Sequence, residues 1–328
     1  MQLDEIANEH LKSINASWDY HIDTRHNFDD ISMDKVIAMI DHIERYQGKK
    51  IHDDAWTILR KHELIKDDKL TFAAYLLFVN NSSSLTSIDI GRFKSETLII
   101  DSLSLSTDLL TEVEESIAFI RKHLMVEYII TGEPQRTEKY DYPLDAIREI
   151  ITNMIVHRDY RDSGNSVVKI FDDRMEFFNP GKLYDDITIE KLVSGDYSSR
   201  SRNRALAKIF KEAGIIERYG SGIKRIINAC IDHGIVAPLF EEYQHGFRVV
   251  LYKQKNSGGV SGGVSGGVSG GVNSIYELIQ KQPDLKAKQI AEQLQTPLRT
   301  VERELKKLKE QDKIHFKGVP KTGGYYVK

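Results

Sequence analysis

The stretch that decides the fold runs over residues 143–157 and reads Pro143-Leu-Asp-Ala-Ile-Arg-Glu-Ile-Ile-Thr-Asn-Met-Ile-Val-His157. Its apolar residues recur with the period of a helix that has one buried face, which predicts an α-helix. Glu149, Asn153 and His157 are spaced i, i+4 and i+8, so they align a carboxylate, an amide and an imidazole along one helix face. A solvent-facing stripe would look similar, and a histidine at a helix end is more often a structural residue than a ligand.

Two strands and two glycine segments follow this helix. Residues 166–171 and 174–178 alternate apolar and polar around the turn Asp172-Asp173, which predicts a β-hairpin leading into a glycine loop, Asn179-Pro-Gly181. About forty residues later, Gly220 and Gly222 open another predicted helix. Backbone N–H groups at a glycine-rich helix start suit a phosphate, although a simple turn would explain Gly-Ser-Gly equally well.

This order of elements resembles the GHKL ATP-binding fold of gyrase, Hsp90, histidine kinases and MutL. Residues 143–230, with Ile155-Val-His-Arg-Asp-Tyr160 and Glu217-Arg-Tyr-Gly-Ser-Gly-Ile223, more closely resemble the RecG-related transcriptional regulators. In that family a Schlafen-type AlbA domain precedes a divergent GHKL-like domain, often with a winged helix at the end. The resemblance extends over residues 30–328, and the first 25 or so residues resemble only the tail of the AlbA domain.

The resemblance implies ATP and Mg²⁺ as ligands and assigns roles to particular residues. Glu149 would be the general base that orients a water, and Asn153 would reach Mg²⁺. Gly181 would let the backbone approach the base or ribose. The remaining implied contacts, all to the triphosphate, are Gly220, Gly222 and the arginines of a lid-like run, Arg200, Arg202 and Arg204.

The first glycine loop departs from the GHKL pattern. The family has Asp-x-Gly-x-Gly there, with an aspartate that accepts from the adenine amino group, whereas this chain has Asn179-Pro-Gly181. Asparagine can accept a hydrogen bond but brings no charge, which puts adenine specificity in doubt. An open alternative is therefore that the pocket has lost ATP binding and that the fold is kept as a dimerisation or sensing scaffold. No Gly-x-x-x-x-Gly-Lys-[Ser/Thr] occurs, so the chain is not a P-loop helicase.

The C-terminal segment has the pattern of a DNA-binding module. Helical periods at 274–282 and 286–294 precede a third helix that opens at Thr296-Pro297, and two short strands near 313–317 and 325–327 flank a basic turn. Three helices and a hairpin indicate a winged helix-turn-helix that binds double-stranded DNA, although such modules also bind proteins. The predicted DNA contacts are Arg299, Thr300 and Arg303 to bases or phosphates, and Lys306, Lys307, Lys317 and Lys321 to phosphates.

Composition sets the boundaries. The 328 residues carry a net charge of −3, but residues 273–328 hold 12 Lys and Arg against 7 Asp and Glu, so a basic module follows an acidic body. Residues 257–272 are four copies of Ser-Gly-Gly-Val, which predicts a flexible linker with a reach of roughly 20–25 Å.

The single cysteine, Cys230, favours a reducing compartment, where it would be a small buried hydrophobe. No membrane or export segment is expected, so the predicted location is cytoplasmic.

The region before residue 140 carries no catalytic constellation. We expect a helix capped by Ser32, a second helix at 53–62, a helix or strand at 70–79, strands at 87–93 and 96–103, and a long helix from 107 to about 130. This region should lead into the nucleotide-like domain and pack on it.

Together these patterns predict an α+β fold in which a GHKL-like α/β sandwich follows a mixed α/β region and precedes a small winged helix. The expected domains are 1–30, an AlbA-like tail; 31–140, the mixed region; 141–255, the nucleotide-binding domain; 256–272, the linker; and 273–328, the winged helix. The predicted function is a DNA-binding transcriptional regulator that binds ATP. A slow ATPase that uses Glu149, or an interaction scaffold, is the alternative, and a two-fold DNA site would suit a homodimer.

Overall fold

A computed structural model describes residues 17–129, 137–184, 187–198, 200–217, 220–253, 275–276, 278–280, 282–293, 301–302, 305–306, 308–309, 313–317 and 323–327. The contacts divide the chain into two units, Met1–Ser257 and Gly258–Lys328, which are described separately. The predicted AlbA-like tail up to residue 16 and the Ser-Gly-Gly-Val repeat lie outside the described residues.

The larger unit begins with a small, mostly helical part. It contains η1 (Trp18–Tyr20), η2 (Phe28–Asp30), α2 (Met33–Gln47), α3 (Ala55–Lys61), the strand pair β1 (Ile65–Lys66) and β2 (Lys69–Leu70), and α4 (Phe72–Phe78). Ser32 caps α2 through its side chain, as predicted. The ambiguous apolar stretch at 70–79 is a buried helix, capped by Thr71.

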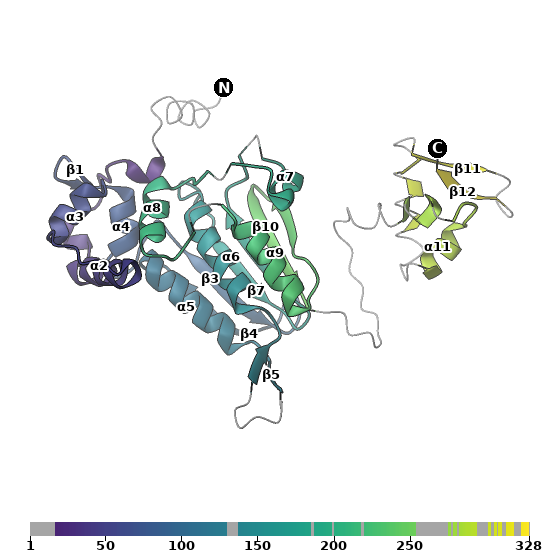
Figure 1. Ribbon diagram of the computed structural model, residues 1–328, viewed down its shortest axis with the longest axis horizontal. Helices are drawn as coiled ribbons and strands as arrows, with labels where there is room; N and C mark the ends of the chain where they lie inside the picture. The colour runs from purple at the N-terminus through teal and green to yellow at the C-terminus, as the bar shows by residue number, and fades with distance from the viewer. Residues whose placement is uncertain are drawn as a thin grey trace. The chain divides into compact units, whose positions relative to one another are not determined.

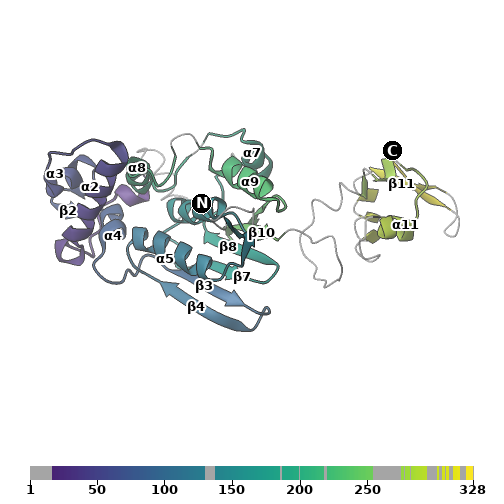
Figure 2. The same cartoon turned by 60° about the horizontal axis from the view of Figure 1, so that its bottom comes forward.

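A six-stranded mixed sheet forms the centre of the larger unit (Figures 1 and 2). Its strands, in spatial order, are β4 (Ile99–Leu105), β3 (Ile88–Phe93), β7 (Ser166–Ile170), β8 (Arg174–Pro180), β10 (Gly246–Tyr252) and β9 (Leu239–Tyr243). β3 and β7 are parallel, and every other neighbouring pair is antiparallel. The strands predicted at 87–93 and 96–103 therefore belong to the same sheet as the 166–178 hairpin.

Three helices cover one face of this sheet: α5 (Leu109–Lys122), α6 (Leu144–His157) and α9 (Gly222–His233), with α5 on the β4 side (Figure 2). The predicted core positions of α6, Ile147, Ile151, Met154 and Ile155, are all buried. α7 (Ile189–Ser194) and α8 (Arg204–Glu212) lie between β8 and α9 in the chain. The larger unit is thus an α+β fold.

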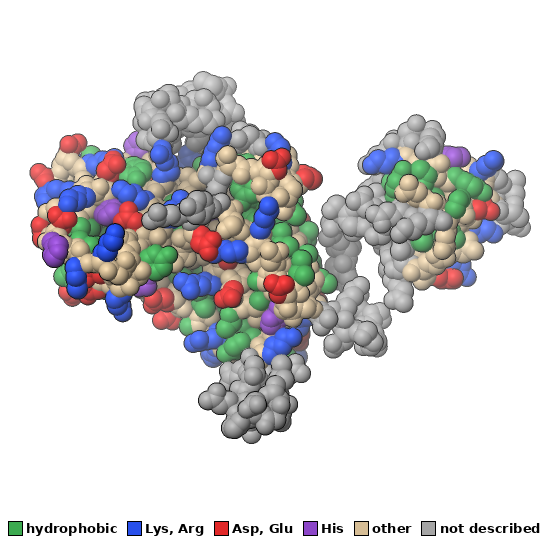
Figure 3. Space-filling view, in the orientation of Figure 1, with side chains coloured by type: hydrophobic (Ala, Val, Ile, Leu, Met, Phe, Trp, Pro, Cys, Tyr) green, Lys and Arg blue, Asp and Glu red, His purple; other side chains and the backbone are tan. Residues whose placement is uncertain are grey.

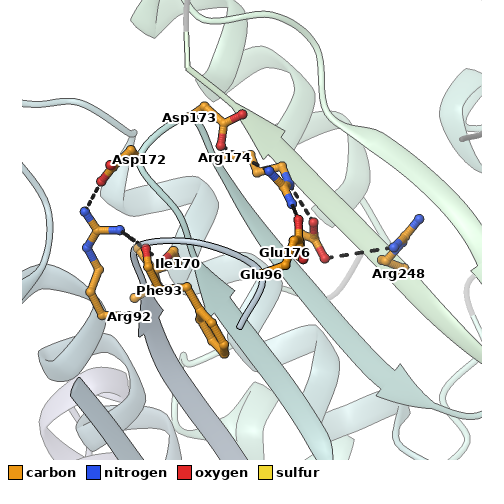
Figure 4. A network of polar contacts seen from close by, with 9 residues as sticks. All are labelled: Arg92, Phe93, Glu96, Ile170, Asp172, Asp173, Arg174, Glu176 and Arg248. Carbon is orange, nitrogen blue, oxygen red and sulfur yellow. Dashed lines mark hydrogen bonds and ion pairs between the residues drawn. The ribbon is translucent and has the colours of Figure 1, made fainter. Parts of the chain in front are cut away.

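The other face of the sheet carries a charged network, shown in Figure 4. The Arg174 guanidinium donates to Glu176 at 2.6 Å and to Glu96 at 2.6 Å, and its carbon lies 4.0 Å from the centre of the Phe171 ring. Arg248 on the adjacent strand β10 lies 3.9 Å from Glu176. These contacts join the β3–β4 loop to β8 and β10, and they hold half-buried charges in pairs.

Two sequence expectations were wrong in their boundaries. The helix predicted to reach residue 130 ends at Lys122, and β5 (Val126–Ile129) pairs with β6 (Thr137–Tyr140) instead. Residues 126–129 include β-branched and aromatic types, which suit a strand as well as they suit a helix. The loop predicted at Asn179-Pro-Gly181 begins later, because β8 continues through Pro180 by pairing with β10.

The smaller unit has its own apolar core. Helical residues at 275–276, 278–280, 301–302, 305–306 and 308–309 accompany α11 (Ala287–Gln293) and the antiparallel pair β11 (Ile314–Lys317) and β12 (Gly324–Val327). The core residues are Ile275, Ile279, Leu285, Ile290, Ala291, Val301, Leu305, Leu308 and Ile314. The apolar residues that recur at helical spacing in this segment are thus buried together.

Candidate nucleotide site

One pocket lies among α6, the start of α9, the end of β8 and the segment that leads to α8. It contains about 1260 Å³ of space free of protein atoms, including open solvent at its mouth. Seven of the residues predicted to contact nucleotide line it: Glu149, Asn153, Asn179, Gly181, Arg202, Gly220 and Gly222. Arg200 lines it too, whereas Arg204 begins α8. The structure brings these residues together, and their roles stay predictions.

Glu149 is the carboxylate of the pocket, and it is held by an arginine. Its Oε2 accepts from Nη2 of Arg225 on α9 at 2.5 Å, and Arg225 also pairs with Glu217. Burial raises the pKa of Glu149 above its usual range, while the nearby Arg225 charge acts in the opposite direction. The predicted base is therefore engaged in an ion pair in this state.

Asn153 sits one helical turn after Glu149, and its amide is oriented by that carboxylate. Its Nδ2 donates to Glu149 Oε1 at 3.2 Å. Its Oδ1 accepts no hydrogen bond from the described residues and is available as a hard oxygen ligand, the type that Mg²⁺ prefers. Among the described residues no group of three His, Cys, Asp or Glu side chains could hold a metal alone. A metal here would therefore need oxygens from a nucleotide or from water.

The two glycines at the start of α9 meet steric and conformational demands. A Cβ on Gly222 would lie 2.2 Å from Glu149 Oε1, so a larger residue there would require the Glu149 carboxylate to shift. Gly220 has a φ of +66°, which favours glycine, and its carbonyl accepts from the Tyr197 hydroxyl at 3.2 Å. Sequence position alone did not indicate this Tyr197 contact from the lid-like run.

Asn179 faces the pocket, and its side chain belongs to a buried chain of hydrogen bonds. Its Oδ1 accepts from the Ser166 hydroxyl at 2.8 Å, and Ser166 Oγ accepts from Arg158 Nη1 at 2.6 Å. Arg158 is only 3% exposed, and its other nitrogen donates to the Gly164 carbonyl. The asparagine that stands in place of the GHKL aspartate is thus held by the neutral Ser166 hydroxyl, which Arg158 in turn holds.

Gly181 and Arg202 lie beside each other at the far end of β8. Gly181 has a φ of +109°, and a Cβ there would lie 3.1 Å from the Asp159 Cβ. Arg202 donates to the Lys182 carbonyl at 2.7 Å and lies 3.4 Å from Asp159. Its Nε is buried without a hydrogen-bond partner in the described structure. Burial acts to raise the pKa of Asp159, but Arg161 and Arg202 outweigh it and hold that pKa below its usual range.

His157 at the end of α6 is a neutral imidazole. Burial, with the positive charges of Arg202 and Lys211, lowers its pKa to about 4. It lines the pocket, where it offers a neutral ring rather than a charge. His157 forms no hydrogen bond with the residues that the structure describes. The interpretation of His157 as a hydrogen-bonded structural residue therefore has no support from such a contact.

Sequence reasoning missed Arg225, Glu217 and Lys211, which also line the pocket. Arg225 is three residues after Gly222 and one helical turn into α9, so its position on the pocket side could have been inferred from the helix start. Its partner Glu149 is 76 residues away in the chain, and no local pattern indicates that contact.

Five of the seven predicted DNA contacts fall outside the part of the chain that the structure describes. Arg299, Thr300, Arg303, Lys307 and Lys321 lie outside the described residues. Lys306 is helical, and Lys317 ends β11 with an exposed side chain. On the face shown in Figure 3, blue and red side chains are interspersed over the larger unit.

Comparisons with known proteins agree with this geometry at a coarse level. Residues 164–251 match the family described as "Putative ATP-dependent DNA helicase recG C-terminal", which supports a RecG-related, ATPase-like domain in the larger unit. The match starts after α6, so it includes β7, β8 and α9 but not Glu149 or Asn153. No curated protein matches the chain.

A solved structure shares the fold. The DIP2311 protein from Corynebacterium diphtheriae aligns with a TM-score of 0.60 and 17% identity, over 98% of this chain and 66% of that one. The chain therefore spans about two thirds of that protein's length, and the likeness concerns the fold alone. Among the described helices, none has the length and apolar character needed to cross a membrane.

Proposed function

We propose that the larger unit binds a nucleoside triphosphate, ATP in the first instance, together with Mg²⁺. The observation that carries the proposal is one pocket in which Glu149 and Asn153 meet Gly222 and the positive-φ glycines Gly181 and Gly220. The free Oδ1 of Asn153 fits one ligand position of Mg²⁺, which when bound would neutralise phosphate charge. The start of α9, which lines the pocket and has no side-chain cap, and the cations Arg200, Arg202 and Lys211 suit a polyanion.

We assign binding rather than rapid hydrolysis to this site. A carboxylate that accepts from a guanidinium at 2.5 Å is a weak base while that pair persists. Turnover would require Arg225 to release Glu149, so hydrolysis should be slow. The slow-ATPase alternative is tested by Glu149→Gln, which should abolish phosphate release while nucleotide affinity is retained.

The nucleotide proposal is tested by thermal unfolding of the full chain with and without ATP–Mg²⁺. A ligand at 100 times its dissociation constant should stabilise the larger unit by about 2.7 kcal/mol. The stabilisation should be lost in Asn153→Ala and kept in the control Asn228→Ala, whose side chain is exposed on α9. No shift at millimolar nucleotide would leave a degenerate pocket and favour the scaffold alternative.

We further propose that the smaller unit is a winged helix that binds double-stranded DNA, so that the chain is a nucleotide-responsive transcriptional regulator. The support is the net positive charge of residues 273–328, the three helical segments and the β11–β12 pair. Fluorescence anisotropy with duplex DNA should show binding that weakens steeply with salt. Arg299→Ala with Arg303→Ala should reduce it, whereas Lys49→Ala with Lys69→Ala, both in the larger unit, should not. Equal loss in both variants, or none in either, would refute the assignment.

A further inference from the structure

The outer side of α5 carries exposed charges in a particular order. Glu114, Glu115, Ala118, Arg121 and Lys122 are exposed and follow the spacing i, i+1, i+4, i+7 and i+8, which places them in one stripe. Glu114, Glu115 and Arg121 form no hydrogen bond or ion pair with any residue that the structure describes. The acidic half of the stripe precedes the basic half, and the smallest side chain lies between them.

When a second copy of α5 runs in the opposite direction, the acidic half of one stripe faces the basic half of the other. If two copies of α5 pack antiparallel about a two-fold axis at Ala118, Glu114 faces the second copy's Lys122, and Glu115 faces the second copy's Arg121. Ala118 then faces its own copy and permits an interaxial distance of about 8–10 Å. Every charge in the stripe would meet an opposite charge, and each contact would occur twice because the interface is isologous.

The sheet edge beneath α5 has no neighbouring strand among the residues that the structure describes. β4 is an edge strand of seven residues with one charged side chain, that of Asp101, and Ile99 and Ile100 are 54% and 58% exposed. A long edge strand with few charges and no proline is a template for pairing with another chain. If the two-fold axis is perpendicular to the sheet, each side chain stays on the same face of the joined sheet. The axis then passes beside one β4 residue, which faces the same residue of the second copy. If that residue is Ser102, all seven residues of β4 are paired.

The same axis can serve both elements. Asp101 Oδ2 binds Lys122 Nζ at 2.9 Å and His123 Nε2 at 2.9 Å, so the start of β4 lies level with the end of α5. One step along β4, about 3.3 Å, corresponds to about two residues back along α5. Helical side chains also lean towards the helix N-terminus. Ser102 and Ala118 therefore lie within about one helical turn of the same level.

We propose that this chain forms a two-fold dimer by antiparallel pairing of β4 with β4 and of α5 with α5, which joins two six-stranded sheets into one. The occupant of the surface is a second copy, because the charge order of α5 complements its own reverse. The proposal is independent of the nucleotide pocket, which lies on the α6–α9 side of the helix layer.

Sedimentation equilibrium of the full chain tests the dimer. Glu115→Arg and Arg121→Glu each place like charges opposite each other twice, and each should weaken association by about tenfold or more. The double variant Glu115→Arg/Arg121→Glu restores complementarity and should dimerise like the wild type. An equimolar mixture of the two single variants should form heterodimers. Lys69→Glu, an exposed change outside the interface, should have no effect.

The outcomes separate cleanly. A wild-type chain that stays monomeric at millimolar concentration overturns the proposal. Single variants that dimerise as well as the wild type, or a double variant that fails to recover while its unfolding curve is unchanged, overturn the α5 pairing. Ile100→Lys tests the strand edge alone, and an unchanged dimer in that variant overturns the β4 pairing.

Discussion

Glu112 should make the larger unit less stable as pH rises, and replacing it with glutamine should remove that dependence. Its side chain on α5 is fully buried. Oε2 accepts from the Thr86 hydroxyl at 2.9 Å, and Oε1 accepts from the Thr107 backbone N–H at 3.1 Å. Burial raises its pKa to about 8, from its ordinary value of 4.5. When the carboxyl is protonated, the Thr86 hydrogen bond reverses, so that Oε2–H donates to the Thr86 oxygen while Oε1 still accepts from the Thr107 N–H.

The sign and the magnitude follow from linkage. The folded state holds a proton on Glu112 that the unfolded chain releases near pH 4.5, so the folded state binds more protons between the two pKa values. The stability contributed by the group is complete below pH 4.5 and falls progressively as pH rises to about 8. At 1.36 kcal/mol per pKa unit, the loss between pH 5 and pH 9 is on the order of 4 kcal/mol.

Glu112→Gln should abolish this loss, because the amide makes both hydrogen bonds without ionising. The free energy of unfolding would be measured in urea from pH 5 to pH 9 by tryptophan fluorescence, since Trp18 and Trp56 both lie in the larger unit. The free energy of unfolding of the variant should exceed that of the wild type by an amount that grows steadily as pH rises. Asp232→Asn, an exposed carboxylate on α9, is the control and should run parallel to the wild type. Parallel curves for Glu112→Gln as well would refute the reasoning.

Three further predictions concern single residues of the larger unit. Tyr142 is 1% exposed and its hydroxyl has no partner in the described structure, so Tyr142→Phe should stabilise the unit by about 1 kcal/mol in urea unfolding; destabilisation would contradict an unpaired hydroxyl. Gly222→Ala should weaken ATP-dependent stabilisation although alanine favours helix, since its Cβ would meet Glu149 Oε1 at 2.2 Å; an unchanged thermal shift would show that Glu149 can move aside. Burial raises the pKa of the Cys230 thiol to about 12, so iodoacetamide should modify it only after unfolding, as mass spectrometry would show.

The sequence could predict what local periodicity controls. The helix at 143–157, the hairpin that follows it and the glycine start of α9 were predicted with nearly correct bounds. The end of α5 was wrong because the apolar residues that follow fit either period until β6 offers a partner strand. The Glu149–Arg225 ion pair could not be predicted, because it joins residues that only the packing of α6 on α9 brings together.

The proposals also constrain how nucleotide could influence DNA. β10 is the last strand of the larger unit in chain order, and the Ser-Gly-Gly-Val repeat follows it. That repeat is predicted to be flexible, so it would not transmit a rigid movement from one unit to the other. A change in the pocket must therefore reach DNA through the number or proximity of smaller units. A dimer through α5 and β4 would tether two DNA-binding units, and the second would bind at an effective concentration set by the linker. Shortening the repeat in a dimeric chain should then change DNA affinity, while the same deletion in the Arg121→Glu variant should not.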